Sequence, residues 1–211
     1  GELHLEIMVD RMLREFNVQA NVGKRRVAYK ETVTKTEWAD IEFNRMLGGK
    51  LQYARVVLEV SPADDNNENR FVNALQPDTL PEEYAAAIEN GVMDSLESGF
   101  LAGYPLVGLV IRLVDAKMDP NSSTPIAFEA AAVQALRKAV ESADPVLLEP
   151  VMDLEVVVPE GFVGEVMGDL NARGADIQKM EMRPSGGQAV RAYAPLSQLF
   201  GYATDLRSAT Q

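Results

Sequence analysis

The chain has 211 residues, a hydrophobic fraction of 46% and a formal net charge of −12, from 20 basic and 32 acidic side chains. This length suits one large or two ordinary globular domains, and the absence of cysteine excludes disulfides, thiolate metal sites and thiol catalysis. The acidic balance argues against a free nucleic-acid-binding protein, although a small basic or neutral patch can still dock on RNA.

The first residues predict a helix. Apolar side chains recur at i, i+3, i+4, i+7, i+8 and i+11 over residues 5–16, which is the pattern of an amphipathic helix. A strand is expected over residues 18–22, then a basic turn with Lys24, Arg25 and Arg26, and an extended Thr-rich stretch over residues 27–35. The basic turn either contacts RNA phosphates or is simply solvated. His4, the only histidine, is expected to be structural or solvated.

The middle of the chain alternates strands and helices. We expect a strand over residues 51–60, a polar loop over 61–69, a helix opened by Pro81 that ends near Gly99, a strand over 105–114 and an Ala-rich helix over 126–140. Asp64, Asp65 and Glu68 in the polar loop could hold a divalent cation weakly, but a solvated acidic loop is the favoured interpretation.

The last third has the order strand, helix, strand, strand, helix. The strands are expected over residues 154–158, 177–183 and 190–194 and the helices over 162–170 and 196–206, with a left-handed C-cap at Gly174 and a hairpin turn at 184–187. This is the order of a split βαβ, ferredoxin-like domain without its fourth strand. We therefore expect the chain to be a piece of a longer protein with a truncated C-terminal sheet. No run approaches the roughly 18 apolar residues of a membrane span, and no signal-peptide pattern opens the chain.

Several runs resemble bacterial translation elongation factor G. LEPVM at 148–152, GDLNAR at 168–173 and LFGYATDLRS at 199–208 are similar to its C-terminal domain, LAGYP at 101–105 and NSS at 121–123 to its fourth domain, and GELHLEI at 1–7 to the end of its third. The resemblance divides the chain into residues 1–22, 23–146 and 147–211. It implies an α+β protein with a ribosomal-S5-like α/β middle domain, including a left-handed βαβ crossover, followed by the ferredoxin-like domain.

The function implied by the resemblance is that of a ribosome-binding arm. In this family the fourth domain is a lever that enters the decoding region and promotes tRNA–mRNA translocation. The expected partners are rRNA, the tRNA–mRNA duplex and ribosomal proteins, with no membrane partner, for a cytoplasmic monomer. No G-x-x-x-x-G-K-[ST] loop is present. We thus expect no catalytic residue, metal or cofactor in these residues, while GTP and Mg²⁺ belong to an N-terminal GTPase domain of the full-length protein.

The RNA-contact candidates lie on two loops. The family's tip pattern Ser-Gly-Gly-x-Gly-Gln-Tyr-Gly matches residues 47–54 and places Gly48, Gly49, Lys50, Gln52 and Tyr53 in it. The glycines allow close approach of the backbone to RNA. Lys50 could contact a phosphate, and Gln52 could bond to a ribose or a base edge. Tyr53 could stack on a base or enter the core. The second loop contributes Met118, Asn121, Ser122 and Ser123, with Met118 where the family has a histidine.

The departures from the family pattern suggest a divergent paralogue. Leu47, Leu51 and Ala54 replace a serine and two glycines, and the basic run that precedes the motif in the family is IEFNRM here, at 41–46. Our hypothesis is a weakened or altered contact with the decoding centre. The alternatives are a paralogue that acts in ribosome recycling or rescue and, from another class, a stand-alone small-molecule enzyme, since both folds also host enzymes.

Overall fold

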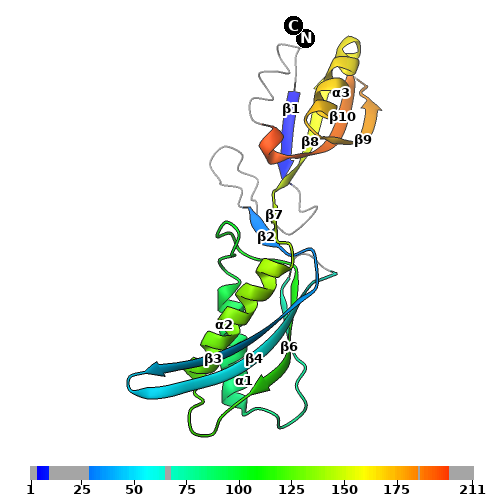
Figure 1. The fold of residues 1–211 in the computed structure, drawn as a ribbon. Helices are drawn as coiled ribbons and strands as arrows, with labels where there is room; N and C mark the ends of the chain where they lie inside the picture. Colours follow the sequence, from blue (N-terminus) through cyan, green and yellow to red (C-terminus); the bar gives the residue numbers. More distant parts are fainter. Residues whose placement is uncertain (1–3, 10–28, 65–67, 185, 200–211) are drawn as a thin grey trace. The chain divides into compact units, whose positions relative to one another are not determined.

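The computed structural model describes residues 4–9, 29–64, 68–184 and 186–199. The chain divides into two compact units, one formed by Tyr29–Leu148 and the other by Gly1–Ala28 with Glu149–Gln211 (Figure 1). Both contain a β-sheet with helical cover, so the fold class is α+β, as predicted.

The first unit is built on a four-stranded sheet of order β3-β4-β6-β5. Its pairs are antiparallel, except for β5 and β6, which run parallel and are joined through α1. A short antiparallel pair, β2 with β7, lies at the two ends of the unit's sequence. The elements are β2 Lys30–Thr32, β3 Glu37–Leu47, β4 Lys50–Pro62, β5 Arg70–Asn73, α1 Glu82–Ser95, β6 Leu109–Lys117, α2 Pro125–Ser142 and β7 Val146–Leu148.

Small side chains let the helices of this unit pack closely. Helix α2 lies on β3 and β4 and also contacts α1 (Figure 1). Its buried face is rich in alanine, which brings the helix axis near the sheet and confirms the expectation of an Ala-rich packing helix. A Cβ at Gly91 of α1 would meet the Glu129 side chain at 3.0 Å, so glycine permits the contact between the helices.

The second unit follows the predicted strand–helix–strand–strand order. Its own elements are β8 Val151–Val158, the 3₁₀ turn η1 Glu160–Phe162, α3 Val163–Ala172, β9 Asp176–Met182, β10 Gln188–Pro195 and the 3₁₀ turn η2 Leu196–Gln198. Gly174 has a φ of 70° directly after α3, which confirms the predicted left-handed cap. The hairpin β9–β10 closes through Gly186 and Gly187, both at positive φ. Of the predicted helix over 196–206, residues 196–198 form the 3₁₀ turn η2, Leu199 follows it outside any helix, and residues 200–206 lie outside the described residues.

One prediction is wrong at the start of the chain. Residues 4–9, expected to begin a helix, form strand β1 (His4–Val9), which pairs antiparallel with β8 on the edge that β10 leaves free. Apolar residues at 5, 7 and 9 also alternate with period two, so this short run is compatible with a strand as well as with a helix. The open edge of β8 offers backbone hydrogen bonds to a strand, and this pairing favours the strand. The rest of the expected helix, the strand over 18–22 and the basic turn lie outside the described residues.

Candidate functional site

The end of the β3–β4 hairpin is the first part of the candidate site. The two strands stay paired up to Leu47 and Lys50, so that Gly48 and Gly49 alone form the turn. Their φ values are 58° and 78°, the positive values that a two-residue type I′ hairpin turn requires at both positions. A Cβ at either glycine would meet nothing within 4 Å, so the backbone angle, and not space, favours glycine here.

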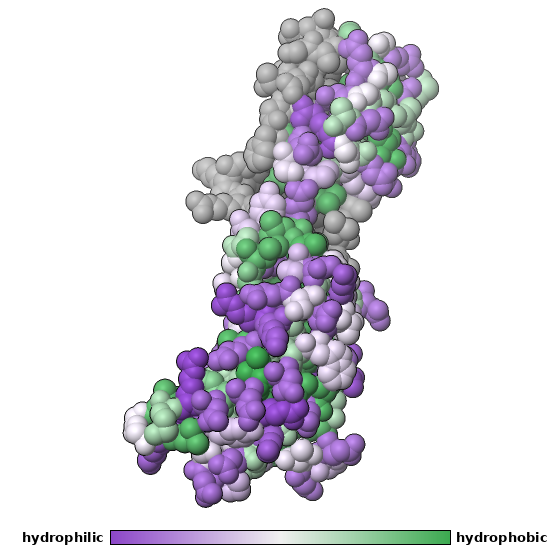
Figure 2. Space-filling model, in the orientation of Figure 1, coloured by the Kyte–Doolittle hydropathy of each residue, from purple (hydrophilic) through white to green (hydrophobic). Residues whose placement is uncertain are grey.

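The surface of this hairpin end is apolar with two cations. Met46 is 64% exposed, Leu47 46% and Leu51 44%. Arg45 and Lys50 are also exposed, and no acidic residue occurs between positions 43 and 52. Figure 2 shows this hydrophobic surface at the end of the hairpin that Figure 1 draws as β3 and β4. We call residues Arg45–Leu51 the hairpin tip; in a chain of net charge −12 it is a locally basic, apolar projection.

The second predicted loop is fastened to the hairpin just behind this tip. The backbone N–H of Tyr53 donates to the carbonyl of Ser122 at 3.1 Å, and the Ser123 hydroxyl donates to the carbonyl of Tyr53 at 2.7 Å. The Ser123 hydroxyl also accepts from the N–H of Asp119 at 2.8 Å, and the hydroxyl of Ser122 donates to the carboxylate of Asp119. Ser122 is only 8% exposed. The two serines therefore hold the loop together and attach it to β4.

Gln52 and Tyr53 are also engaged within the protein. The side-chain oxygen of Gln52 accepts from the hydroxyl of Thr124, which in turn caps α2 by accepting from the N–H of Ala127 at 3.1 Å. Tyr53 is 9% exposed, and burial, with a further contribution from Glu42, raises the pKa of its phenol. Its neighbours Ala54 and Val56 enter the core under the helices, so strand alternation places the Tyr53 side chain on the other face of the sheet, where it is buried. Met118 packs, half-buried, against the hydrophobic core.

The predicted contact residues thus separate into groups by position. Gly48, Gly49, Lys50 and Asn121 are exposed, whereas Gln52, Tyr53, Met118, Ser122 and Ser123 make internal contacts. Lys24, Arg25 and Arg26 lie outside the described residues. Sequence reasoning missed Met46 as part of the same surface, although the two-residue glycine turn would have placed it opposite Leu51.

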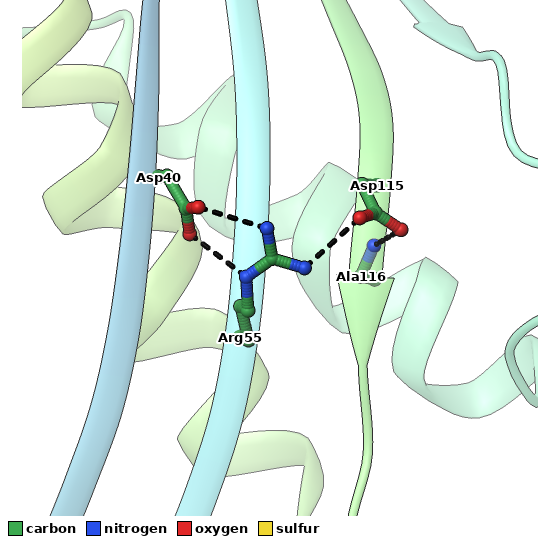
Figure 3. Close-up of polar contacts among 4 residues, drawn as sticks. All are labelled: Asp40, Arg55, Asp115 and Ala116. Atoms are coloured by element: carbon green, nitrogen blue, oxygen red, sulfur yellow. Dashed lines mark hydrogen bonds and ion pairs between the residues drawn. The ribbon is translucent and has the colours of Figure 1, made fainter.

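A charged triad crosses the sheet on the face away from the helices. Arg55 of β4 donates to both carboxylate oxygens of Asp40 on β3, at 3.0 and 2.8 Å, and to Asp115 on β6 at 2.9 Å (Figure 3). The hydrogen bonds with Asp40, then those with Asp115, raise the pKa of Arg55. The guanidinium lowers the pKa of Asp115, helped by the N–H of Ala116 (Figure 3). The triad joins three strands, and sequence reasoning did not identify it.

A buried carboxylate lies in the same unit. Glu31 of β2 is 0% exposed and accepts three backbone hydrogen bonds, from Leu101 at 2.9 Å, Ala102 at 2.8 Å and Tyr104 at 2.9 Å. A Cβ at Gly99 would lie 2.1 Å from the Glu31 carboxylate, so glycine is required there. With both oxygens bonded to backbone, Glu31 is arranged to hold the loop over residues 99–104.

The described residues contain no group of three or more His, Asp or Glu side chains placed to hold a metal ion. The acidic loop therefore offers no such group in its described part, and Asp65 lies outside it. None of the described helices combines the length and the apolar character needed to cross a membrane.

Comparison with known proteins gives matches over nearly the whole chain. The family model described as "Elongation factor G, domain IV" matches residues 25–144, and that described as "Elongation factor G C-terminus" matches residues 146–211. A crystal structure of a protein from Thermus thermophilus is 33% identical, with a TM-score of 0.71 over 88% of this chain. This chain spans 28% of the length of that protein.

Proposed function

Because this chain belongs to the elongation factor G family, over residues 25–144 and 146–211, we propose that it is the ribosome-binding arm of a translational GTPase that promotes tRNA–mRNA translocation. In this proposal the hairpin tip touches RNA. Domains IV and V of the family carry no catalytic site themselves, so the arm acts by position and contact. The observation that carries the proposal is the exposed tip of Arg45–Leu51 with its two cations.

Hydrogen bonds behind the hairpin tip attach it firmly to the rest of the unit, as expected of a part that transmits force. The hairpin is paired throughout its length, and the loop over residues 117–124 is bonded to β4 directly behind the turn. Thr124 links this attachment to the start of α2, which lies on the core of the unit. A contact made at Lys50 is therefore transmitted to a helix and a sheet, and not to a flexible loop.

The chemistry of the whole protein is part of the same proposal. GTP and Mg²⁺ would bind in a nucleotide-hydrolysing domain elsewhere in the full-length protein, and the arm would act in the cytoplasm as part of a monomeric factor. Its partners would be rRNA, the tRNA–mRNA duplex at the decoding region and ribosomal proteins. The basic and apolar character of the tip suits RNA, because cations approach phosphates while apolar side chains can rest against bases.

A second candidate function follows from the apolar part of the tip. Met46, Leu47 and Leu51 expose hydrocarbon where a hairpin designed for phosphates and base edges would carry polar donors. This favours a divergent paralogue that acts in ribosome recycling or rescue, with a contact based on shape and apolar surface. Translocation remains the first proposal.

Translocation kinetics of the full-length factor test the proposal. Lys50→Gln should slow translocation severalfold while GTP hydrolysis on the ribosome persists, because the variant loses one of the two cations at the tip but keeps the fold. Lys138→Gln is the matched control, since Lys138 is exposed on α2, fourteen residues and about 20 Å of helix beyond Thr124. Equal translocation rates for the two variants and the wild type would contradict the role of the tip.

The second candidate is tested by grafting. The tip Arg45–Leu51 is placed in a standard elongation factor G. Slow translocation with retained ribosome splitting or release supports the recycling or rescue function, whereas full wild-type translocation speed argues against any functional divergence of the tip.

A further inference from the structure

Strand β9 forms one edge of the sheet in the second unit (Figure 1). Among the described residues only β10 pairs with it, so the outer side of β9 carries unpaired backbone N–H and carbonyl groups. A register shift leaves Gln178 without a partner in β10, and the ladder is regular over residues 179–182. Met180 and Met182 in this regular part are 46% and 69% exposed. The edge can therefore accept a further strand.

The backbone of Met180 points away from β10. In the hairpin turn the N–H of Arg183 donates to the carbonyl of Gly187 at 3.0 Å, so these two residues form a hydrogen-bonded pair. Along an antiparallel ladder such pairs alternate with pairs that share no hydrogen bond. The next hydrogen-bonded pair is Glu181 with Ala189. Met180 belongs to the pair after it, and its N–H and carbonyl are directed to the outer edge.

The side chains give this edge one apolar and one charged side. Met180 lies opposite Val190, which is buried in the core under α3, so the methionine extends the apolar surface of that core to the edge. Lys179 and Glu181 alternate with it and point to the other face of the sheet. They pair with each other at 2.5 Å, and both side chains are more than half exposed. One cation and one anion thus flank Met180 symmetrically.

We propose that two copies of this chain associate through their β9 strands, antiparallel and centred on Met180. The two copies of Met180 then exchange two backbone hydrogen bonds and bring their side chains together beside the two cores. Lys179 of each copy lies opposite Glu181 of the other, which gives two complementary charge pairs related by the two-fold axis. The partner is a second copy because the sequence around Met180 is complementary to itself.

Other registers of the same pairing are less favourable. A pairing centred on Lys179 or on Glu181 opposes like charges, and the outward backbone groups belong to Met180 instead. A pairing centred on Met182 opposes Met180 to Pro184, which has no N–H to donate. The contact centred on Met180 is short, so the dimer is weak and forms at high concentration. It involves the free chain only and does not depend on the role of the hairpin tip.

Sedimentation velocity of the 211-residue chain over a wide range of concentrations, combined with hydrogen exchange, tests the proposal. We expect a reversible equilibrium between monomer and dimer that weakens in high salt, because exposed charge pairs are screened. The amide of Met180 should exchange more slowly in the dimer than in the monomer, because its N–H becomes bonded. A monomer up to the limit of solubility, or a dimer in which this amide exchanges as in the monomer, would overturn the proposal.

Charge reversal identifies the register. Lys179→Glu and Glu181→Lys each oppose like charges twice in a pair of identical copies, and each should weaken self-association about tenfold. An equimolar mixture of the two variants restores opposite charges at both places and should associate about as tightly as the wild type. Lys138→Glu, at an exposed position of the first unit, is the control and should change nothing. A mixture that associates no better than the separate variants would contradict the pairing. Both reversals are at exposed positions and leave the core intact.

Discussion

At the scale of single residues, Glu31 determines the course of a loop distant in sequence. Its carboxylate receives N–H groups from residues 101, 102 and 104, and Gly99 leaves room for it. Successive backbone N–H groups directed at one anion form a nest of the kind that usually holds a ligand anion. Here the protein provides the anion itself, so this nest is structural.

Replacing Glu31 by glutamine should weaken the first unit. In the glutamine variant an NH₂ group replaces one of the two carboxylate oxygens. This group cannot accept a hydrogen bond, and it faces a backbone N–H that is itself a donor. We expect the free energy of unfolding to fall by about 2–3 kcal/mol. Urea denaturation followed by the fluorescence of Trp38, the only tryptophan, measures it. Glu97→Gln, at an exposed position, serves as the control and should change little; an equal effect of the two variants would show that the nest is unimportant.

The triad of Arg55 should make stability depend on pH at the acidic end. The folded-state pKa of Asp115 lies below its unfolded value, so its contribution is complete above an unfolded pKa of about 3.9 and is lost as the pH falls through the folded pKa. The side chain of Asp115 is 54% exposed, which limits the effect to roughly 1 kcal/mol or less.

Asp115→Asn, compared with wild type from pH 7 to pH 2, checks this dependence. The variant should be less stable at pH 7, and the difference should vanish at the acidic end. Asp94→Asn, on the exposed face of α1, is the control for a change of charge alone. A stability difference that stays constant across the whole pH range would mean that ionisation of Asp115 contributes nothing.

Single-residue roles of this kind were largely beyond sequence reasoning. The resemblance made Ser122 and Ser123 candidates for RNA contact, but the pattern of a loop does not reveal that one hydroxyl bonds to Asp119 within the loop and the other to the carbonyl of Tyr53 on the strand beside it. Glu31 receives its donors from a segment about 70 residues later, a contact that no local pattern encodes. Tyr53 is 9% exposed, which leaves little of its ring for a base to stack on, and its role in RNA contact stays a prediction.

At the scale of elements, most predictions from apolar periodicity held, but the helical pattern over residues 5–16 was wrong for residues 4–9, which form β1. The helices around Ile88 and Phe128 and the order of β8, α3, β9 and β10 followed from apolar spacing and turn residues. Strand β3 was not predicted, because its exposed side carries polar residues and its end is apolar, which obscures the alternation. Strand β5 has four residues, too few for a period to show.

The junction of β4, the 117–124 loop and α2 depends on Thr124. Thr124→Ala removes both the cap on Ala127 and the bond to Gln52, so the first unit should lose about 1–2 kcal/mol of stability. Thr124→Ser retains the hydroxyl and should recover most of the loss. Thermal unfolding observed by circular dichroism and Trp38 fluorescence compares the three proteins. A serine variant as unstable as the alanine variant would assign the effect to the methyl group and not to the hydrogen bonds.

At the scale of the whole molecule, two units with separate cores carry two distinct surfaces. The first has the basic, apolar hairpin tip, and the second has the outer edge of β9. The net charge of −12 gave no indication of either, because an average conceals local groups of charge. The family resemblance directed attention to the tip, but its altered residues, Leu47 and Leu51 above all, became interpretable only when the structure placed them with Met46 on one exposed surface.

The central claim is that the hairpin tip touches RNA on the ribosome, and site-specific crosslinking tests it most directly. A photoreactive amino acid is placed at position 50 or, as the control, at position 138 of the full-length factor, which is then bound to ribosomes carrying tRNA and mRNA. The account predicts crosslinks to rRNA, tRNA or mRNA from position 50 and few from position 138. Crosslinks from position 50 to protein alone, or no difference in RNA crosslinking between the two positions, would contradict it.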